Sequence, residues 1–391
     1  MTAFGAPRRA SGAALAERMV ESSVATWAAT LEGLTGYWAG AIERRATPLD
    51  LVTDAARFWA AVMRRRPPQW ASPHEVVLET PLARLRDFSQ RSRAPVVPTL
   101  VLPPQAGHDS CIVDYSPGQS QMGTIREAGL KRAWALDWIA ANRDTRTASI
   151  EDYLAVVERA VLAVGPPVNL IGDCQGGWLA AIYAALRPEH INTLTVAGAP
   201  IDFHAGGGVI AEWVAFLWGL GEMSFYRAVV GAAGGVLPGR RMLAGFVGIK
   251  PENEIAKHLQ LLATLHDRAA VERYREFEDW FKRTQDIPGP FYLWIVQHLF
   301  RRNSLIRGEL EIGGERVDLG RIAVPLQLLA GENDHITPPG QVFALEAAVS
   351  TPSAQILKDV TSGGHLGLFM SRAALRDHWP PLLARVREHS G

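Results

Sequence analysis

The stretch that decides the fold runs Asn169-Leu170-Ile171-Gly172-Asp173-Cys174-Gln175-Gly176-Gly177-Trp178-Leu179-Ala180-Ala181. An apolar run that begins at Val168 ends here in Gly-x-Cys-x-Gly, and an Ala- and Leu-rich segment follows up to Arg187-Pro188. The pattern predicts a buried strand, a sharp turn with Cys174 at its tip, and a helix that begins directly after the turn. The first N–H groups of that helix would face the sulfur and stabilise negative charge there.

This arrangement resembles the nucleophile elbow of α/β-hydrolases, with cysteine in place of serine. Gly172 and Gly176 fit positions where a side chain would collide with a neighbouring strand or helix, because the elbow residue has a strained backbone. The bare Gly-x-Cys-x-Gly motif would also suit a buried structural cysteine. The strand-turn-helix setting favours the nucleophile.

The overall composition is that of an ordinary globular protein and argues against several classes of function. The 391 residues are 48% hydrophobic and 20% charged, and 40 basic residues balance 40 acidic ones. We expect no nucleic-acid partner, since the Arg64-Arg65-Arg66 run is followed by two prolines, as at a solvated helix end. We expect no membrane span, because the longest apolar run, Gly208 to Gly221, contains Glu212 and is shorter than ~20 residues. It reads instead as a buried or surface-seeking helix.

The two cysteines, Cys111 and Cys174, suggest a reducing compartment. No apolar segment and cleavage site follow Arg8 and Arg9, so we expect no secretory signal and a cytoplasmic location. No cluster of His, Cys and Asp has the spacing of metal ligands, and no glycine-rich nucleotide motif follows a strand. We therefore expect neither a metal nor a bound cofactor.

Residues 1–73 read as an N-terminal helical arm. Four tryptophans are spread over its apolar stripes, and such stripes usually form a core. We interpret them as packed faces, against the main domain or a second subunit. The stripes comprise Val20, Val24, Leu31 and Leu34, followed by Leu51, Ala55, Phe58 and Val62.

Residues 74–202 and 303–391 read as the two parts of an α/β core. Apolar and charged residues alternate over 75–79 and 83–88, as in half-exposed strands, whereas buried strands are predicted at 96–102, 133–137, 168–171, 194–197, 326–330 and 354–357. A helix over 149–164 and another after the elbow alternate with these strands. The pattern predicts an α/β-hydrolase fold with a mostly parallel, doubly wound sheet.

Residues 203–302 interrupt this alternation with an aromatic-rich stretch of helical spacing. An independent helical domain would fit, but the sheet pattern resumes afterwards. We therefore favour a helical cap, or lid, inserted over the active site.

Three candidate catalytic residues occur in the order nucleophile, acid, base, as in α/β-hydrolases. Cys174 is followed after 160 positions by Asp334 and after 31 more by His365. Each comes just after a predicted strand, so parallel pairing would bring the three to one edge of the sheet. His365 would take the proton of Cys174, and Asp334 would orient His365 or receive a proton from an attacking hydroxyl.

Further residues are expected around this triad. The backbone amides of Gln175 and of Ala106, in the 105–107 loop, would form the oxyanion hole. His335 and His108 are weaker candidates for a supporting shell, and Cys111 is expected to be a plain loop or core thiol. Asp173 would disfavour a thiolate beside it unless its side chain points to solvent.

Beyond the fold, the chain resembles the polyhydroxyalkanoate synthase family, cysteine acyltransferases that polymerise 3-hydroxyacyl-CoA. The resemblance covers roughly residues 75–390, except the cap, and rests on these stretches: 172–177 (Gly-Asp-Cys-Gln-Gly-Gly), 199–203 (Ala-Pro-Ile-Asp-Phe), 308–319, 332–338 (Glu-Asn-Asp-His-Ile-Thr-Pro) and 363–365 (Gly-Gly-His). It implies that Cys174 carries the growing chain, with CoA thioester as substrate and a polymer granule as a surface of association. A homodimer and a partner subunit both stay open.

Departures from the synthase pattern leave other functions open. Asp173 and Gln175 stand where synthases usually have apolar or aliphatic residues. Cys174-Gln175, Gly107-His108, 291–293 and 364–369 are similar to intracellular polyhydroxyalkanoate depolymerases, so a depolymerase or thioesterase is the alternative. A non-catalytic granule-surface or scaffold protein that kept the fold is a third. The sequence leaves open the acyl chain length, the direction of the reaction and the resting position of the cap.

Overall fold

The computed structural model describes residues 12–90, 92, 95–249 and 251–391. The chain divides into two compact units. The first, here the arm unit, combines the N-terminal segment up to Pro68 with Arg240–Thr284, and the second, here the core unit, combines Gln69–Gly239 with Gln285–Gly391. The middle of the expected cap thus groups with the expected arm. The four segment boundaries drawn from the sequence stay predictions, and the arm before Gly12 lies outside the described residues.

The core unit is built on an eight-stranded sheet with the sequence order 1-2-4-3-5-6-7-8. The second strand is antiparallel to both its neighbours, and the remaining pairs are parallel. This order confirms the predicted α/β-hydrolase fold. In spatial order the strands are β1 (Glu75–Glu79), β2 (Ala83–Asp87), β6 (Ala133–Trp138), β3 (Thr99–Leu102), β7 (Val168–Asp173), β8 (Ile191–Ala197), β13 (Leu326–Gly331) and β14 (Ile356–Thr361).

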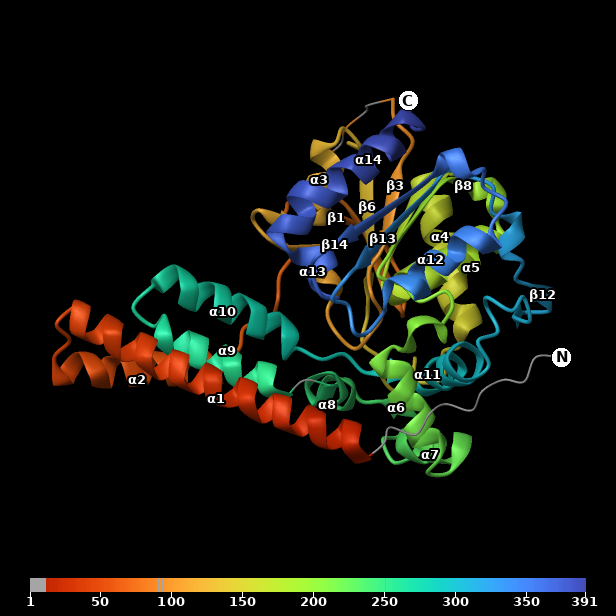
Figure 1. The fold of residues 1–391 in the computed structure, drawn as a ribbon. Helices are drawn as coiled ribbons and strands as arrows, with labels where there is room; N and C mark the ends of the chain where they lie inside the picture. The colour runs from red at the N-terminus through yellow and green to blue at the C-terminus, as the bar shows by residue number, and fades with distance from the viewer. Residues whose placement is uncertain (1–11, 91, 93–94, 250) are drawn as a thin grey trace. The chain divides into compact units, whose positions relative to one another are not determined.

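Helices cover both faces of this sheet (Figure 1). They are α3 (Gln121–Glu127), α4 (Ile150–Val164), α5 (Gln175–Leu186), α12 (Pro339–Ala348), α13 (Gly367–Met370) and α14 (Trp379–Glu388). Every residue of β3, β6, β7 and β13 is buried, which explains why these strands read as continuous apolar runs. At the start of α4 the Asp152 carboxylate accepts from the Ser149 N–H at 2.8 Å, as its capping sequence predicts.

Short elements complete the core unit. They are α6 (Val209–Trp218), α7 (Glu222–Gly231), α11 (Gly289–Trp294) and the strands β4 (Asp114–Ser116), β5 (Gln119–Ser120), β9 (Val236–Leu237), β10 (Ile287–Pro288), β11 (Glu311–Ile312) and β12 (Glu315–Arg316). Phe291 of α11 stacks on Tyr153 of α4 with ring centroids 4.0 Å apart, which fixes α11 to the helical layer. The apolar run after Gly208 forms α6, whose Trp213 and Phe216 are exposed. No helix in the described ranges has the length and apolarity needed to cross a membrane.

The arm unit is helical, with α1 (Gly12–Glu43), α2 (Pro48–Met63), α8 (Gly239–Ile249), α9 (Pro251–Ala263) and α10 (Arg268–Phe281). Small residues let α1 approach α9 closely. A Cβ at Gly33 would come within 2.7 Å of the Leu259 Cβ, and one at Gly36 within 3.0 Å of the Ala263 Cβ. Close backbone approach at these two glycines therefore contributes to the α1–α9 interface.

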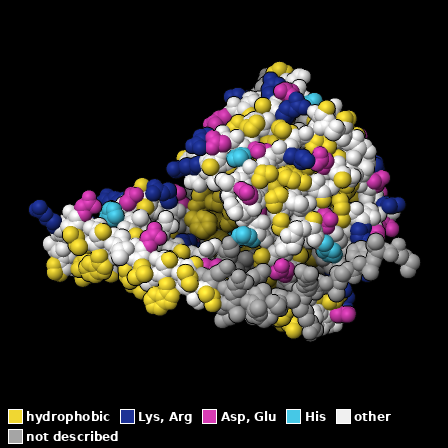
Figure 2. Space-filling view, viewed as in Figure 1, with side chains coloured by type: hydrophobic (Ala, Val, Ile, Leu, Met, Phe, Trp, Pro, Cys, Tyr) yellow, Lys and Arg dark blue, Asp and Glu magenta, His cyan; other side chains and the backbone are white. Residues whose placement is uncertain are grey.

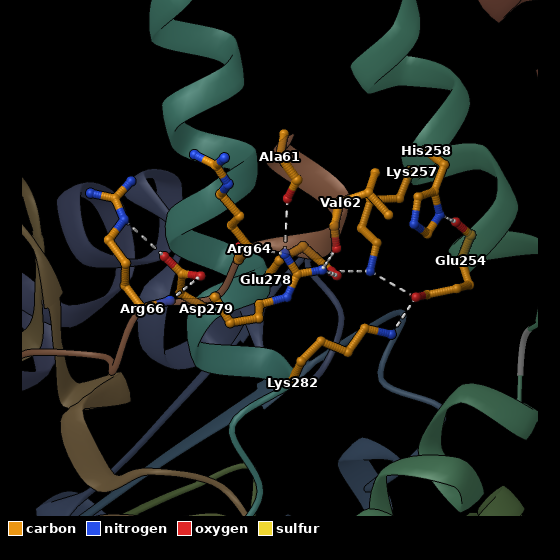
Figure 3. A network of polar contacts seen from close by, with 11 residues as sticks. Ala61, Val62, Arg64, Arg66, Glu254, Lys257, His258, Glu278, Asp279 and Lys282 are labelled. Carbon is orange, nitrogen blue, oxygen red and sulfur yellow. Dashed lines mark hydrogen bonds and ion pairs between the residues drawn. The ribbon is translucent and has the colours of Figure 1, made fainter. Parts of the chain in front are cut away.

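The arm unit also contains an apolar cluster and a network of charges. The cluster contains Ala61, Leu261, Leu265 and Tyr274, with Tyr37, Phe58 and Val62 packed against it. Beside it, the fully buried Glu278 accepts from Arg65 at 3.3 Å and from Lys257 (Figure 3). Asp279 accepts from the N–H of Arg66 at 2.9 Å. These contacts join α10 to α9 and to the end of α2.

Within the single chain the α1 stripe is not a buried core face, and its packing against a second subunit stays a prediction. Val20, Val24 and Leu31 are each 62% exposed and Leu34 is 42% exposed. The glycine-rich face packs instead, because it allows the backbone of α1 to come closer to α9. On α2, by contrast, Phe58 and Val62 do pack as expected.

Candidate active site

The elbow places Cys174 at a strained point between β7 and α5. Its φ is 51° and its ψ is −120°, a conformation that a non-glycine residue rarely adopts. The Cys174 N–H donates to the Ala197 carbonyl of β8 at 2.8 Å, and its own carbonyl accepts from Gly177 at 2.9 Å. These bonds hold the turn in place, so the sulfur sits at the carboxyl edge of the sheet beside the first turn of α5.

Glycines make this turn possible. A Cβ at Gly172 would collide with the backbone of Gly176 and Gly177, and one at Gly176 would collide with the carbonyl of Leu102 on β3. A larger residue at either position would press its Cβ against backbone atoms, and backbone cannot move aside as a flexible side chain can. The structure therefore confirms the reason predicted for Gly172 and Gly176, that a side chain at either position would collide with a neighbouring element.

The three candidate catalytic side chains meet. His365 Nε2 lies 3.1 Å from Cys174 Sγ, and His365 Nδ1 lies 2.7 Å from Asp334 Oδ2. Since the carboxylate accepts a hydrogen bond from Nδ1–H, Nε2 is left to exchange a proton with sulfur. Residues 191 and 31 positions apart in sequence thus form one continuous hydrogen-bonded chain.

Asp334 is fixed by the loop that follows β13. Its Oδ1 accepts from the N–H groups of Ile336 and Thr337, both at 2.9 Å, which leaves Oδ2 for His365. The side chain has no exposed area. Asp334 therefore caps the next turn and orients the imidazole at the same time.

The charges around His365 favour its protonated form. Burial works against the imidazolium, but the neighbouring Cys174 and Asp334 and their hydrogen bonds raise the pKa of His365 well above its ordinary value. The ring edge is also held by Phe369, with centroids 5.6 Å apart at 84°. A positively charged imidazole between the sulfur and the carboxylate is therefore favoured in the folded protein.

The two amides expected to form the oxyanion hole belong to the start of α5 and to the loop after β3. Gln175 is the first residue of α5, and Ala106 is buried in the loop after β3. That loop is anchored, since Gln105 Nε2 donates to the Tyr153 hydroxyl at 3.0 Å and the Gly107 carbonyl accepts from Gln285 at 2.8 Å. Among the described residues, no backbone carbonyl accepts a hydrogen bond from the N–H of either Ala106 or Gln175. Their assignment stays a prediction.

Asp173 follows neither alternative considered from the sequence. Its side chain is fully buried, and Gln121 Nε2 donates to its Oδ1 at 3.2 Å. Burial raises the pKa of Asp173 to about 8, against which the Gln121 bond and the charge of His365 act only partly. A carboxyl that keeps its proton at neutral pH does not oppose a thiolate next to it.

The remaining candidates differ in how far they are buried. His108 is buried in the loop after β3, whereas His335 is exposed and its carbonyl accepts from Val209 at 3.1 Å. Their supporting roles stay predictions. Cys111 is buried, and burial together with the charges of Asp109, Asp137 and Asp114 raises the pKa of its thiol well above the usual value. In the ranges that the structure describes, no group of three or more His, Cys, Asp or Glu could hold a metal ion.

Two contributors to the site were not found from the sequence. Gln121 reaches Asp173 from the start of α3, 52 positions away, and Phe369 borders His365 from α13. For Gln121 no sequence signal existed, because the pairing depends on how α3 crosses the sheet. Phe369 lies one helical turn after His365, so its position offered a weak signal.

Comparison with known proteins confirms the predicted resemblance to polyhydroxyalkanoate synthases. The chain is 28% identical over 329 residues to the poly(3-hydroxyalkanoate) polymerase subunit PhaC of Haloferax mediterranei, covering 82% of this chain and 64% of the relative. It is also 28% identical over 288 residues to PhaC of Haloarcula marismortui, covering 71% of this chain and 58% of the relative. The chain thus spans about three fifths of the length of these two curated relatives.

Among solved structures, the chain is similar to the alpha/beta hydrolase domain-containing protein 10 from mouse. The TM-score is 0.46 at 14% identity, with 81% of this chain and 98% of that one covered. A family model described as "Protein of unknown function (DUF3141)" matches residues 81–385, which include the elbow, Asp334 and His365. The chain therefore belongs to the DUF3141 family.

Proposed function

We propose that this chain is a cysteine acyltransferase of the polyhydroxyalkanoate synthase type, which transfers 3-hydroxyacyl groups from CoA thioesters through an acyl-cysteine. The observation that carries the proposal is the chain of contacts from Asp334 through His365 to Cys174, with 2.7 Å and 3.1 Å between the reacting atoms. The similarity to PhaC polymerase subunits supports the choice of substrate. The proposal includes a cytoplasmic location and association with the polymer granule.

In the first half-reaction, His365 holds the proton of Cys174 and the thiolate attacks the thioester carbonyl. The oxyanion that forms would receive hydrogen bonds from the amides of Gln175 and Ala106. When the intermediate collapses, the carbon–sulfur bond to CoA breaks. His365 gives its proton to the departing CoA thiolate, and the acyl group remains on Cys174.

In the second half-reaction, the hydroxyl of a 3-hydroxyacyl group attacks the acyl-cysteine. His365 takes the hydroxyl proton, an ester bond forms, and the proton returns to the Cys174 sulfur as the thioester bond breaks. Asp334 keeps the imidazole oriented and stabilises its positive charge in both steps. No cofactor enters either half-reaction.

Sulfur suits this reaction because the donor is itself a thioester. Exchange of an acyl group between two thiols changes the free energy little, so the acyl-cysteine keeps the reactivity of the donor. A serine nucleophile would form a more stable ester and lose part of that driving force.

The test is release of CoA from 3-hydroxybutyryl-CoA, followed by sizing of the product. We expect the wild type to release CoA and form oligoesters, Cys174→Ala to do neither, and Cys111→Ala, the buried-thiol control, to retain both. Wild-type activity no greater than that of Cys174→Ala would contradict the proposal.

Hydrolysis is the second candidate, favoured by the polar residues on both sides of the nucleophile. The buried Asp173 and the partly exposed Gln175 stand where the synthase resemblance implies apolar neighbours. In that reaction water, activated by His365, would replace the hydroxyl in the second step. Free 3-hydroxy acid, formed from amorphous polymer or from the thioester without chain growth, would select this function.

A further inference from the structure

The exposed stripe of the arm unit extends over two helices and forms a seam. On α1 the seam has six large apolar residues, and on α2 it has four large ones around Ala56. Their side chains are between 42% and 74% exposed. The seam residues are Val20, Val24, Trp27, Leu31, Leu34 and Trp38 of α1, and Leu49, Val52, Trp59 and Met63 of α2. Hydrophobic side chains gather along this edge of the helices in the space-filling view (Figure 2).

The spacing of the seam is that of a coiled coil. Successive α1 positions are 4, 3, 4, 3 and 4 residues apart, and the α2 positions, with Ala56, are 3, 4, 3 and 4 apart. A repeat of about 3.5 residues keeps an apolar line facing a second helix along its length. The occupant that this spacing fits is therefore helical.

The seam is not the face through which the arm unit holds itself together. On α1, Gly33 and Gly36 face α9 and Gly40 faces His266 just beyond it, and at 100° per residue the three lie opposite the seam. On α2, Phe58 and Ala61 belong to the inner cluster, again opposite the seam. On both helices the seam residues are therefore directed away from the packed interior of the arm unit.

Charge and area favour a protein occupant over a lipid surface. From Val20 to Met63, the span of the seam, the sequence has three arginines (Arg44, Arg45 and Arg57) and no Lys, whereas helices that lie on membranes are rich in both. Ten large side chains with on the order of 100 Å² exposed each offer about 1,000 Å² per chain, above the ~800 Å² per partner of a standard interface. A patch of this size is unusual on a monomer.

We infer that this seam is the interface with a second copy of the same chain, with α1 and α2 of one copy packed against α1 and α2 of the other. A two-fold pairing brings the same surface together twice, and a seam without charges sets no like charges against each other. A second copy also supplies helices with the same repeat. This interface is independent of the proposed catalytic function.

The inference is tested by measuring the mass of the 391-residue protein in solution between about 1 and 100 μM. We expect a dimer, and we expect Leu31→Glu combined with Val52→Glu to raise its dissociation constant by at least about a hundredfold, because the charges would be buried without partners. The matched control is Leu162→Glu, which changes a 55% exposed leucine of α4 outside the seam. Circular dichroism checks that each variant is folded.

A second measurement separates loss of the interface from loss of folding. The melting temperature of a dimer rises with protein concentration. We expect this dependence in the wild type and in Leu162→Glu, and its absence in the folded double variant. A wild type that stays monomeric throughout, or a dimer that the double variant retains, would overturn the inference. Binding of a monomer to polyester particles or lipid vesicles through the seam would overturn it as well.

Discussion

The elbow helix α5 and the arm helix α1 are both rich in glycine, alanine and large apolar residues, yet they use them in opposite ways. From Gly176 to Leu186 every residue of α5 is buried, so the helix has no outward face. In α1, Gly33 and Gly36 are packed closely against α9, whereas Trp27 and Trp38 are 70% and 52% exposed. The difference teaches that apolar content does not decide which face packs. The closest approach that the backbone can make decides it.

Gly176 of α5 and Gly40 of α1 also differ in what surrounds them. A Cβ added at Gly176 would collide with the carbonyl of Leu102. A Cβ added at Gly40 would meet only the ring of His266, at 3.3 Å. Backbone cannot move without disturbing the sheet, but a ring can turn. Gly176 and Gly40 should therefore respond differently to the same substitution, and three further pairs contrast a buried or catalytic group with a control residue of the same type.

The largest effect is expected for Gly176→Ala, which should lower the free energy of unfolding by at least about 4 kcal/mol or prevent folding. Gly40→Ala should change it by less than about 1 kcal/mol, because helix propensity gains offset a small ring movement. Urea unfolding measures both. Equal losses in the two variants would remove the contrast.

Next, His365→Gln should reduce kcat/KM for CoA release about 1,000-fold, since the proton acceptor of Cys174 is lost. His378→Gln is the matched control, because His378 pairs with Asp359 at 2.8 Å in the same manner but away from the site. Steady-state kinetics checks this prediction. A similar loss in both variants would show that histidine–carboxylate pairs act here through folding.

Within the arm unit, Glu278→Gln should lower the free energy of unfolding by about 3 kcal/mol, because Arg65 and Lys257 lose their buried partner (Figure 3). Glu272→Gln should cost less than about 0.5 kcal/mol, since its pair with Arg66 is exposed. Chemical unfolding of both variants gives the comparison. Equal losses of unfolding free energy in the two variants would show that burial does not determine how much this network stabilises the arm unit.

The smallest effect concerns the pH dependence of stability. Asp173 holds its proton in the folded state up to about pH 8 but releases it near 3.8 when unfolded, so the wild type loses stability as pH rises between these values. Asp173→Asn lacks this loss, and its advantage should grow by about 2 kcal/mol from pH 6 to 8 and then level off.

The control for this effect is Asp377→Asn on the surface. Its hydrogen bond with Arg376 lowers the pKa of Asp377, so the group is ionised in both states over this range and the difference should not change with pH. Urea unfolding at pH 6, 7 and 8 measures both variants. A difference for Asp173→Asn that did not depend on pH would mean that the buried carboxyl is ionised.

Much of the core unit could be predicted from the sequence because its signals are local. Continuous apolar runs marked β3, β6, β7 and β13, and the Gly-x-Cys-x-Gly turn marked the elbow. Asp334 and His365 could be named because each directly follows a strand, and parallel strands end at one edge.

The sequence by itself determined which segments form the strands of the sheet and which three side chains form the candidate triad. Strand formation and turn geometry depend on residues that are neighbours in the sequence. Only the tertiary structure decided that Asp173 is buried beside Gln121 and that α1 turns its glycines inward and its tryptophans outward. The physical reason is that burial and closest approach depend on which elements meet across long stretches of chain. The sequence of a single helix does not determine which of its faces will pack against another element.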